Sequence, residues 1–282
     1  MGTFRRAFAL TRASWSVLRR DKELVALPLL AGFACLLTAV PCIAVIASVD
    51  ARAVDDPGAD WPYAFAVVVL AAGLYLWCAY VFVFCNVALL CAADERLRGG
   101  DPTLHSALRG AASRAFAILP WAILSATVSL VFAVIRERAG IVGRVLVTLG
   151  IVWSLVTFLV LPVLVFERTG VRAALRRSTE LFRRTWGDAA VASGGMCVLA
   201  VVASLAGAVA IGPFVLAGGR AAVLGLALFG LWATVAACVG ASLSGILQLA
   251  CYRYAVDGTV PGFGDELIQA AFSRRGRGAG AR

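Results

Sequence analysis

The chain has 282 residues, of which 61% are hydrophobic and only 15% are charged. Soluble domains carry roughly 45–50% apolar and 25% charged residues. The composition therefore excludes a soluble enzyme, a DNA-binding module and a secreted disulfide scaffold. The 26 lysines and arginines exceed the 16 aspartates and glutamates and leave a net charge of +10. Because the apolar residues gather in long runs, we expect this charge to meet anionic lipid, and no nucleic acid is expected as a partner.

The apolar runs predict an all-α, polytopic membrane protein with six transmembrane helices and amphipathic interfacial helices on its cytoplasmic face. A spanning helix needs about 20 predominantly apolar residues. The predicted spans cover about 24–49, 62–93, 115–135, 145–166, 189–217 and 221–252 of a transmembrane domain at 24–252. A basic amphipathic helix is expected at 1–23. A cytoplasmic tail is expected at 253–282, with one short amphipathic helix and a disordered end. Signal peptides have apolar cores of roughly 7–15 residues, so the longer first run is interpreted as an uncleaved span.

The basic residues are distributed unequally between the connections. Alternate connections hold 21 lysines and arginines, and the remaining connections hold 5. Positively charged loops stay on the cytoplasmic side of a membrane. The sequence therefore predicts a multi-pass protein of the bacterial inner (plasma) membrane with both termini in the cytoplasm.

The segment before the first span is patterned as an amphipathic helix. Phe4, Phe8 and Trp15 recur at helical spacing on one face, and arginines occupy the opposite face. The connection before the fifth span repeats this pattern. Basic helices with an aromatic stripe lie among lipid headgroups, although such helices can also pack on the bundle. The predicted interfacial residues are Arg5, Arg12, Trp15, Arg19, Arg176, Arg177, Arg183, Arg184 and Trp186.

Similar basic stretches precede several spans and suggest an internal repeat. Ala107-Leu108-Arg109 matches Ala174-Leu175-Arg176, and the N-terminal segment aligns with the connection before the fifth span. We interpret these as three copies of an amphipathic helix followed by a membrane helix, an arrangement with parallels in transporters. In the middle copy, Asp101 is the expected N-cap and Pro102 the expected first helical residue.

Residues with catalytic or metal-binding chemistry are scarce. All eight cysteines lie inside apolar runs, none forms a CxxC pair, and the single histidine, His105, lies in a predicted connection. Structural zinc needs about four nitrogen or sulfur ligands, and intramembrane enzymes need a nucleophile, an acid/base pair or a metal cluster. We expect no cofactor, no metal, no disulfide and no enzymatic activity.

Helix-breaking and polar residues recur at a similar depth near the predicted cytoplasmic ends of the spans. Proline frees main-chain groups, and at membrane depth these groups must face protein or a water-filled cavity. One hypothesis is an inner-leaflet vestibule for an anionic headgroup. Alternatively, the prolines are ordinary and the amides pair across helix interfaces. The candidate vestibule residues are Pro28, Asn86, Pro120, Pro162, Gly194, Gly195 and Gln248.

Small residues recur every fourth position in the sixth predicted span, including Gly240 and Ser244. Such spacing lets helix backbones approach closely. The stripe packs either inside the bundle or against a second copy of the chain, which makes a homo-oligomer one possible assembly; the protein partner is unknown.

Three stretches of the chain resemble an uncharacterised bacterial family of six-span membrane proteins. They are Ala13 to Leu24 with Pro28-Leu29-Leu30, Ala174 to Ser178 with Thr185-Trp186-Gly187, and Tyr252-Arg253-Tyr254-Ala255 with Gly258, Pro261 and Phe263. The layout is more distantly similar to the membrane domains attached to glycerophosphodiester phosphodiesterases. The resemblance implies the six-span fold and a loose link to lipids.

Together these observations predict a non-enzymatic inner-membrane protein whose basic face engages anionic phospholipid, in membrane organisation or lipid handling. One alternative is a transporter or transporter subunit with an inner-leaflet vestibule. Another is a membrane scaffold that recruits a cytoplasmic protein through the arginine-rich helices.

Overall fold

The computed structural model describes residues 23–55, 60–138, 149–150, 152–154, 156–216 and 219–257. Within α8 the side chains at 182–201 and at 215–216 lie outside this description. The described chain is helical, and its regular elements are α2 (Glu23–Asp55), α3 (Asp60–Leu97), α4 (Leu104–Ala112), α5 (Ala115–Arg138), α7 (Val160–Phe166), α8 (Val171–Leu216) and α9 (Gly219–Asp257).

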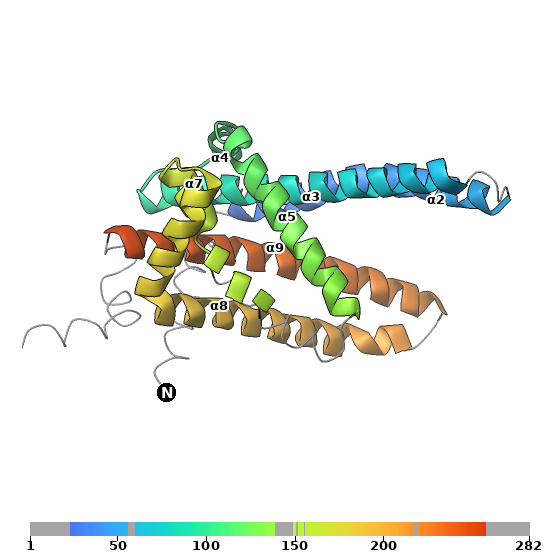
Figure 1. Ribbon diagram of the computed structural model, residues 1–282. Coiled ribbons are helices and arrows are strands. Elements are labelled where there is room, and N and C mark those ends of the chain that lie inside the picture. Colours follow the sequence, from blue (N-terminus) through green and yellow to red (C-terminus); the bar gives the residue numbers. More distant parts are fainter. Residues whose placement is uncertain are drawn as a thin grey trace, which may run out of the picture.

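The long helices form two antiparallel pairs. In Figure 1, α2 runs beside α3 and α8 runs beside α9, while α5 packs on α3 and runs obliquely to both pairs. Short α4 and α7 lie at one end, where α3 and α9 finish and α8 begins. We call this end the packed end.

Among the described residues, four helices are long and apolar enough to cross a membrane. These candidate spans are Leu24–Ser48, Phe65–Leu97, Ala115–Ile135 and Gly219–Asp257, and a shorter apolar helix covers Val202–Phe214. They correspond to the first, second, third and sixth predicted spans. The helices support a membrane protein with an all-helical fold, whereas the full set of six spans stays a prediction.

The fourth and fifth predicted spans differ from their expected form. The described part of the fourth segment (145–166) is interrupted by a turn at Phe158–Leu159, so that α7 covers only its last seven residues. The fifth predicted span and the amphipathic segment before it form one helix, α8, of 46 residues. A separate interfacial helix is therefore absent from this described stretch.

Buried apolar residues gather at the packed end. The core unites the start of α2, the last turns of α3, the whole of α7 and the C-terminal half of α9. Farther from this end the helices expose large apolar side chains, such as Phe33 at 64% and Val223 at 68%. Lipid tails are the natural neighbours of such surfaces, because exposure of this extent in water favours association or aggregation.

Two glycines allow helices to approach closely. A Cβ atom at Gly245 of α9 would lie 2.5 Å from Cδ2 of Leu89 in α3. A Cβ atom at Gly207 of α8 would lie 2.3 Å from the ring of Trp232 in α9, whose indole N–H donates to the Ala203 carbonyl over 3.1 Å. Gly240 has no atom within 4 Å of such a position, so the tight contacts involve only certain small residues.

The start of α4 differs from its sequence prediction. Thr103, and not Asp101, is the N-cap, because its hydroxyl accepts from the Ser106 N–H while the Ser106 hydroxyl accepts from the Thr103 N–H. This reciprocal arrangement is a capping box with serine in the third helical position. The Asp101 carboxylate accepts instead from Arg96 over 3.2 Å.

Helix α4 and the first turns of α8 bury equivalent positions of the proposed repeat. Each follows a residue with positive φ, Gly99 at 86° and Arg168 at 53°. The matched residues are Ala107 with Ala174, both buried; Leu108 with Leu175, both half-buried; Arg109 with Arg176, both exposed; and Ala111 with Ser178, both buried. The two copies therefore present the same face to the core.

Candidate functional site

The break in the fourth segment is closed by a side chain of α9. Pro162 has no N–H, so the Phe158 carbonyl four residues earlier lacks its helical donor. The Gln248 side-chain amide donates a hydrogen bond to this carbonyl. Gln248 is buried, and a buried amide without an acceptor costs about 1–3 kcal/mol. The contact therefore satisfies two groups that would both be unpaired in the protein interior.

A hydrogen bond from a side chain of α8 stabilises the same break. The Ser178 hydroxyl donates to the Val156 carbonyl over 2.6 Å, and Ser178 is fully buried. On the far side of the break, the Val163 N–H donates to the Leu159 carbonyl over 3.2 Å. The carbonyls at the break thus accept from side chains of other helices, whereas the Leu159 carbonyl accepts from a main-chain N–H of α7.

The same arrangement recurs at the first proline of α2. Pro28 deprives the Leu24 carbonyl of its helical donor, and the hydroxyl of Ser242 in α9 lies 3.1 Å from this oxygen. The hydroxyl also lies 2.9 Å from the Cys238 carbonyl of its own helix, and its single proton serves the two acceptors. In two other segments, a proline leaves a main-chain carbonyl without its helical donor. Helix α9 supplies a side-chain donor to each of these carbonyls.

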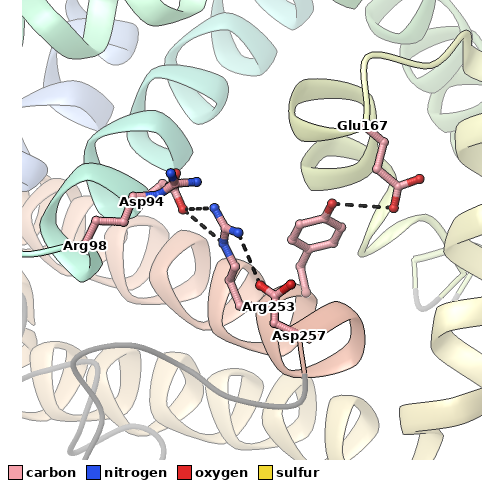
Figure 2. A network of polar contacts seen from close by, with 6 residues as sticks. Asp94, Arg98, Glu167, Arg253 and Asp257 are labelled. Atoms are coloured by element: carbon pink, nitrogen blue, oxygen red, sulfur yellow. Dashed lines mark hydrogen bonds and ion pairs between the residues drawn. The ribbon is translucent and has the colours of Figure 1, made fainter.

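An ion pair joins α9 to α3 at the packed end (Figure 2). Nη2 and Nε of Arg253 donate to Oδ1 of Asp94 over 2.5 and 3.1 Å. Arg98 binds the other carboxylate oxygen over 3.0 Å, and Asp257 lies 3.3 Å from Nη1 of Arg253. The Arg253 and Asp94 side chains are only 19% and 12% exposed, so each charge needs partners to offset its removal from water.

A second polar contact joins α9 to the turn after α7. The Tyr252 hydroxyl lies 3.5 Å from Oε1 of Glu167, and Nε of Arg177 donates to the same oxygen over 3.3 Å. The Tyr252 ring stacks on Phe166 with centroids 5.8 Å apart, and the Arg253 guanidinium lies 5.3 Å from the Phe166 centroid. Phe166 therefore links the two polar contacts.

These residues form what we call the α9 clasp, which consists of Ser242, Gln248, Tyr252 and Arg253 together with the groups they bind. Its carboxylates and guanidinium groups are paired with one another. Among the described residues, no group of three or more histidine, cysteine or acidic side chains is placed to hold a metal ion. The geometry of the clasp fixes how four segments pack.

A different set of arginines lies at the packed end outside the clasp. Arg109, Arg168 and Arg172 are exposed and Arg114 is half-buried, and no ion pair joins them to another described side chain. Arg109 contacts His105 over 2.9 Å. We call these four residues the arginine rim. Phe116, two positions after Arg114, is 90% exposed, which places a large apolar ring close to the rim in the chain.

The structure describes only some of the predicted interfacial residues. Arg176 is exposed and lies 3.9 Å from Glu180, while Arg177 binds both Glu167 and Glu180. Arg183, Arg184 and Trp186 lie on α8, with side chains outside the described residues. Arg5, Arg12, Trp15 and Arg19 also lie outside the described residues.

The candidate vestibule residues do not share one environment. Pro162 and Gln248 meet at the Phe158 carbonyl, and both are buried. Asn86 is exposed on α3, with its Oδ1 4.0 Å from a Cβ position at Gly245. Pro28 is half-buried and Pro120 is exposed. The side-chain surroundings of Gly194 and Gly195 lie outside the described residues.

Sequence reasoning missed most of the clasp and the bond from Ser178 to the fourth segment. Asp94 and Glu167 are acidic residues at the ends of apolar runs, and Ser178 and Ser242 are single hydroxyls among apolar neighbours. One signal was present in the sequence, because each interior proline identifies a carbonyl, four residues earlier, that needs another donor. The sequence alone does not say which distant side chain supplies it.

The helices and their apolar surfaces define a multi-helix integral membrane protein. The chain belongs to a family of unknown function, DUF6159, whose model matches residues 64–263. This range contains the clasp residues of α9 and their acceptors on α3 and the fourth segment. No curated protein and no solved structure matches the chain.

Proposed function

We infer that this protein is a non-enzymatic membrane protein of the bacterial inner membrane whose arginine rim binds anionic phospholipid headgroups at the cytoplasmic leaflet. The observation that carries this proposal is the division of charge at the packed end. Asp94, Glu167 and Asp257 are engaged in ion pairs there, whereas the rim arginines have no acidic partner among the described residues.

Electrostatics and position both support headgroup binding. Each basic residue near the cytoplasmic leaflet contributes about 1 kcal/mol of attraction to anionic lipid. The exposed ring of Phe116 follows Arg114 at the start of α5, and an apolar ring next to a cation matches the boundary between acyl chains and headgroups.

The test compares lipid retention in nanodiscs that contain equal amounts of phosphatidylglycerol and phosphatidylcholine. Native mass spectra of the released protein should show preferential retention of phosphatidylglycerol. The combined change R109Q, R114Q, R168Q and R172Q should remove this preference. R220Q is the matched control, because Arg220 is exposed at the opposite end of α9. A fourfold variant that keeps the preference would contradict the proposal.

A second candidate function is transport, and the broken fourth segment favours it. Discontinuous membrane helices form substrate sites in many secondary transporters. This function predicts substrate-dependent flux in liposomes, with loss of flux when P162A restores the missing main-chain donor. Recruitment of a cytoplasmic protein is less well supported, because Arg177, one of its predicted contacts, is already paired with Glu167 and Glu180.

A further inference from the structure

The turn at Phe158–Leu159 divides the fourth segment into two parts with different surroundings. After the turn, every residue from Val160 to Val165 is buried. Before the turn, Leu149 and Val152 are about half exposed, at 49% and 50%. The later part belongs to the core, and the earlier part lies at its edge.

The later part is anchored by contacts that do not depend on Gln248 or Ser178. Val163 donates to Leu159 and Glu167 donates to Val163 through main-chain bonds. The Glu167 side chain is bound by Arg177 and approached by Tyr252. The neighbouring Phe166 ring stacks on Tyr252. These contacts hold α7 against α8 and α9.

Within residues 152–154 and 156–158, the contacts that the structure describes are made by side chains and can exchange. The Val156 carbonyl accepts a hydrogen bond from Ser178 of α8, and the Phe158 carbonyl, in the turn itself, accepts one from Gln248 of α9. The Trp153 ring stacks on Trp121 of α5 with centroids 6.4 Å apart. Side-chain donors can rotate away, whereas a helical N–H is fixed by the backbone it belongs to.

We propose that the Phe158–Leu159 turn is a hinge about which the residues carrying Trp153 and Val156 move relative to an immobile α7, and that Gln248 is the latch that holds the closed position. Opening breaks the bonds from Gln248 and Ser178 and separates Trp153 from Trp121. Pro162 maintains the hinge, because any other residue there would supply an N–H to the Phe158 carbonyl and favour a continuous helix.

The test uses the tryptophans of the full chain as probes. The protein is produced with 5-fluorotryptophan, placed in nanodiscs and studied by fluorine NMR, with resonances assigned through single Trp→Phe variants. The wild type should show a minor second state at Trp153 and Trp121 together. Trp77 on α3 and Trp232 on α9 are the internal references, because they lie outside the moving part.

Two substitutions separate a hinge from simple loss of stability. Gln248→Leu should raise the population of the minor state about fivefold, the equivalent of one net hydrogen bond, without changing Trp77 or Trp232. Pro162→Ala should reduce the minor state, and Gln248→Leu should then have no effect in that background. Pro162→Ala also tests the hinge if Gln248→Leu fails to fold.

Three outcomes would overturn the proposal. One is a single Trp153 state in the wild type that remains single in Gln248→Leu. Another is a change in all four resonances, which would indicate general loosening of the fold. The last is a rise in the minor state on Gln248→Leu that is as large in the Pro162→Ala background as in the wild type. That result would show that the Gln248 amide does not stand in for the N–H that Pro162 lacks.

Discussion

The amide of Gln248 hydrogen-bonds the main-chain oxygen of Phe158, although 90 positions separate the two residues in the chain. The bond occupies the place of the helical donor that Pro162 lacks. A buried glutamine therefore completes the main-chain hydrogen bonding of another segment.

Replacement of Gln248 should destabilise the protein in a manner that depends on Pro162. We expect Gln248→Leu to lower the free energy of unfolding by about 1–3 kcal/mol, because it leaves a buried carbonyl unpaired. In Pro162→Ala, the new N–H pairs with that carbonyl and the loss should largely disappear. Denaturant titration of the two single variants and the double variant gives the coupling energy. Additive losses would argue against the pairing.

Ser242 should show the same dependence on Pro28 with a smaller effect. Its hydroxyl already shares its proton with the Cys238 carbonyl, so the bond to Leu24 is only part of its hydrogen bonding. We expect Ser242→Ala to cost about 0.5–1.5 kcal/mol, and less after Pro28→Ala. The same unfolding titrations measure it. A larger loss in the Pro28→Ala background would show that Ser242 acts elsewhere.

Addition of a methyl group should change the stability of the protein differently at two glycines of α9. Gly245→Ala forces a Cβ atom to 2.5 Å from Leu89, whose side chain is 2% exposed and has little room to move. Overpacking of this kind costs about 1–3 kcal/mol. Gly240→Ala meets no atom within 4 Å and should be neutral or gain up to about 1 kcal/mol from helix propensity.

Thermal unfolding of both variants in one detergent provides the comparison. Leu89→Ala should reduce the penalty of Gly245→Ala, because it removes the atoms that clash. Equal transition temperatures for the two glycine variants would contradict the close approach of α3 and α9.

The ion pair between Asp94 and Arg253 should matter far more than the surface pair between Asp101 and Arg96. Removal of one partner of a buried pair costs about 3–5 kcal/mol, and this pair, slightly exposed at both ends, should lie near the lower limit. The Asp101 side chain is 91% exposed, so Asp101→Asn should cost at most about 1 kcal/mol.

Unfolding of Asp94→Asn, Arg253→Met and the double variant tests this difference. The double variant should lose less than the two single losses combined, because the charges it leaves unpaired, Arg98 and Asp257, are 62% and 44% exposed. An Asp94→Asn protein as stable as Asp101→Asn would show that the buried pair contributes little.

The sequence by itself determined the class of this protein. Runs of about 20 apolar residues form helices in a membrane because only helices and closed barrels pair every backbone group internally. Four of the six predicted spans appear as helices of the required length, and the paired burial of Ala107 and Ala174 follows the repeat read from the sequence. A proline inside a helix leaves a carbonyl four residues earlier without its donor. The sequence therefore singled out Pro28 and Pro162 as unusual positions.

Only the tertiary structure decided where the polar groups find their partners. The bonds from Ser242 to Leu24 and from Arg253 to Asp94 span 218 and 159 positions, and no periodicity along the chain contains that information. Apolar packing of α3, α7 and α9 brings these groups together, and the cost of a buried unpaired group then selects the pairs. Hydropathy reports how strongly each segment prefers the membrane, whereas the partners depend on how the segments pack.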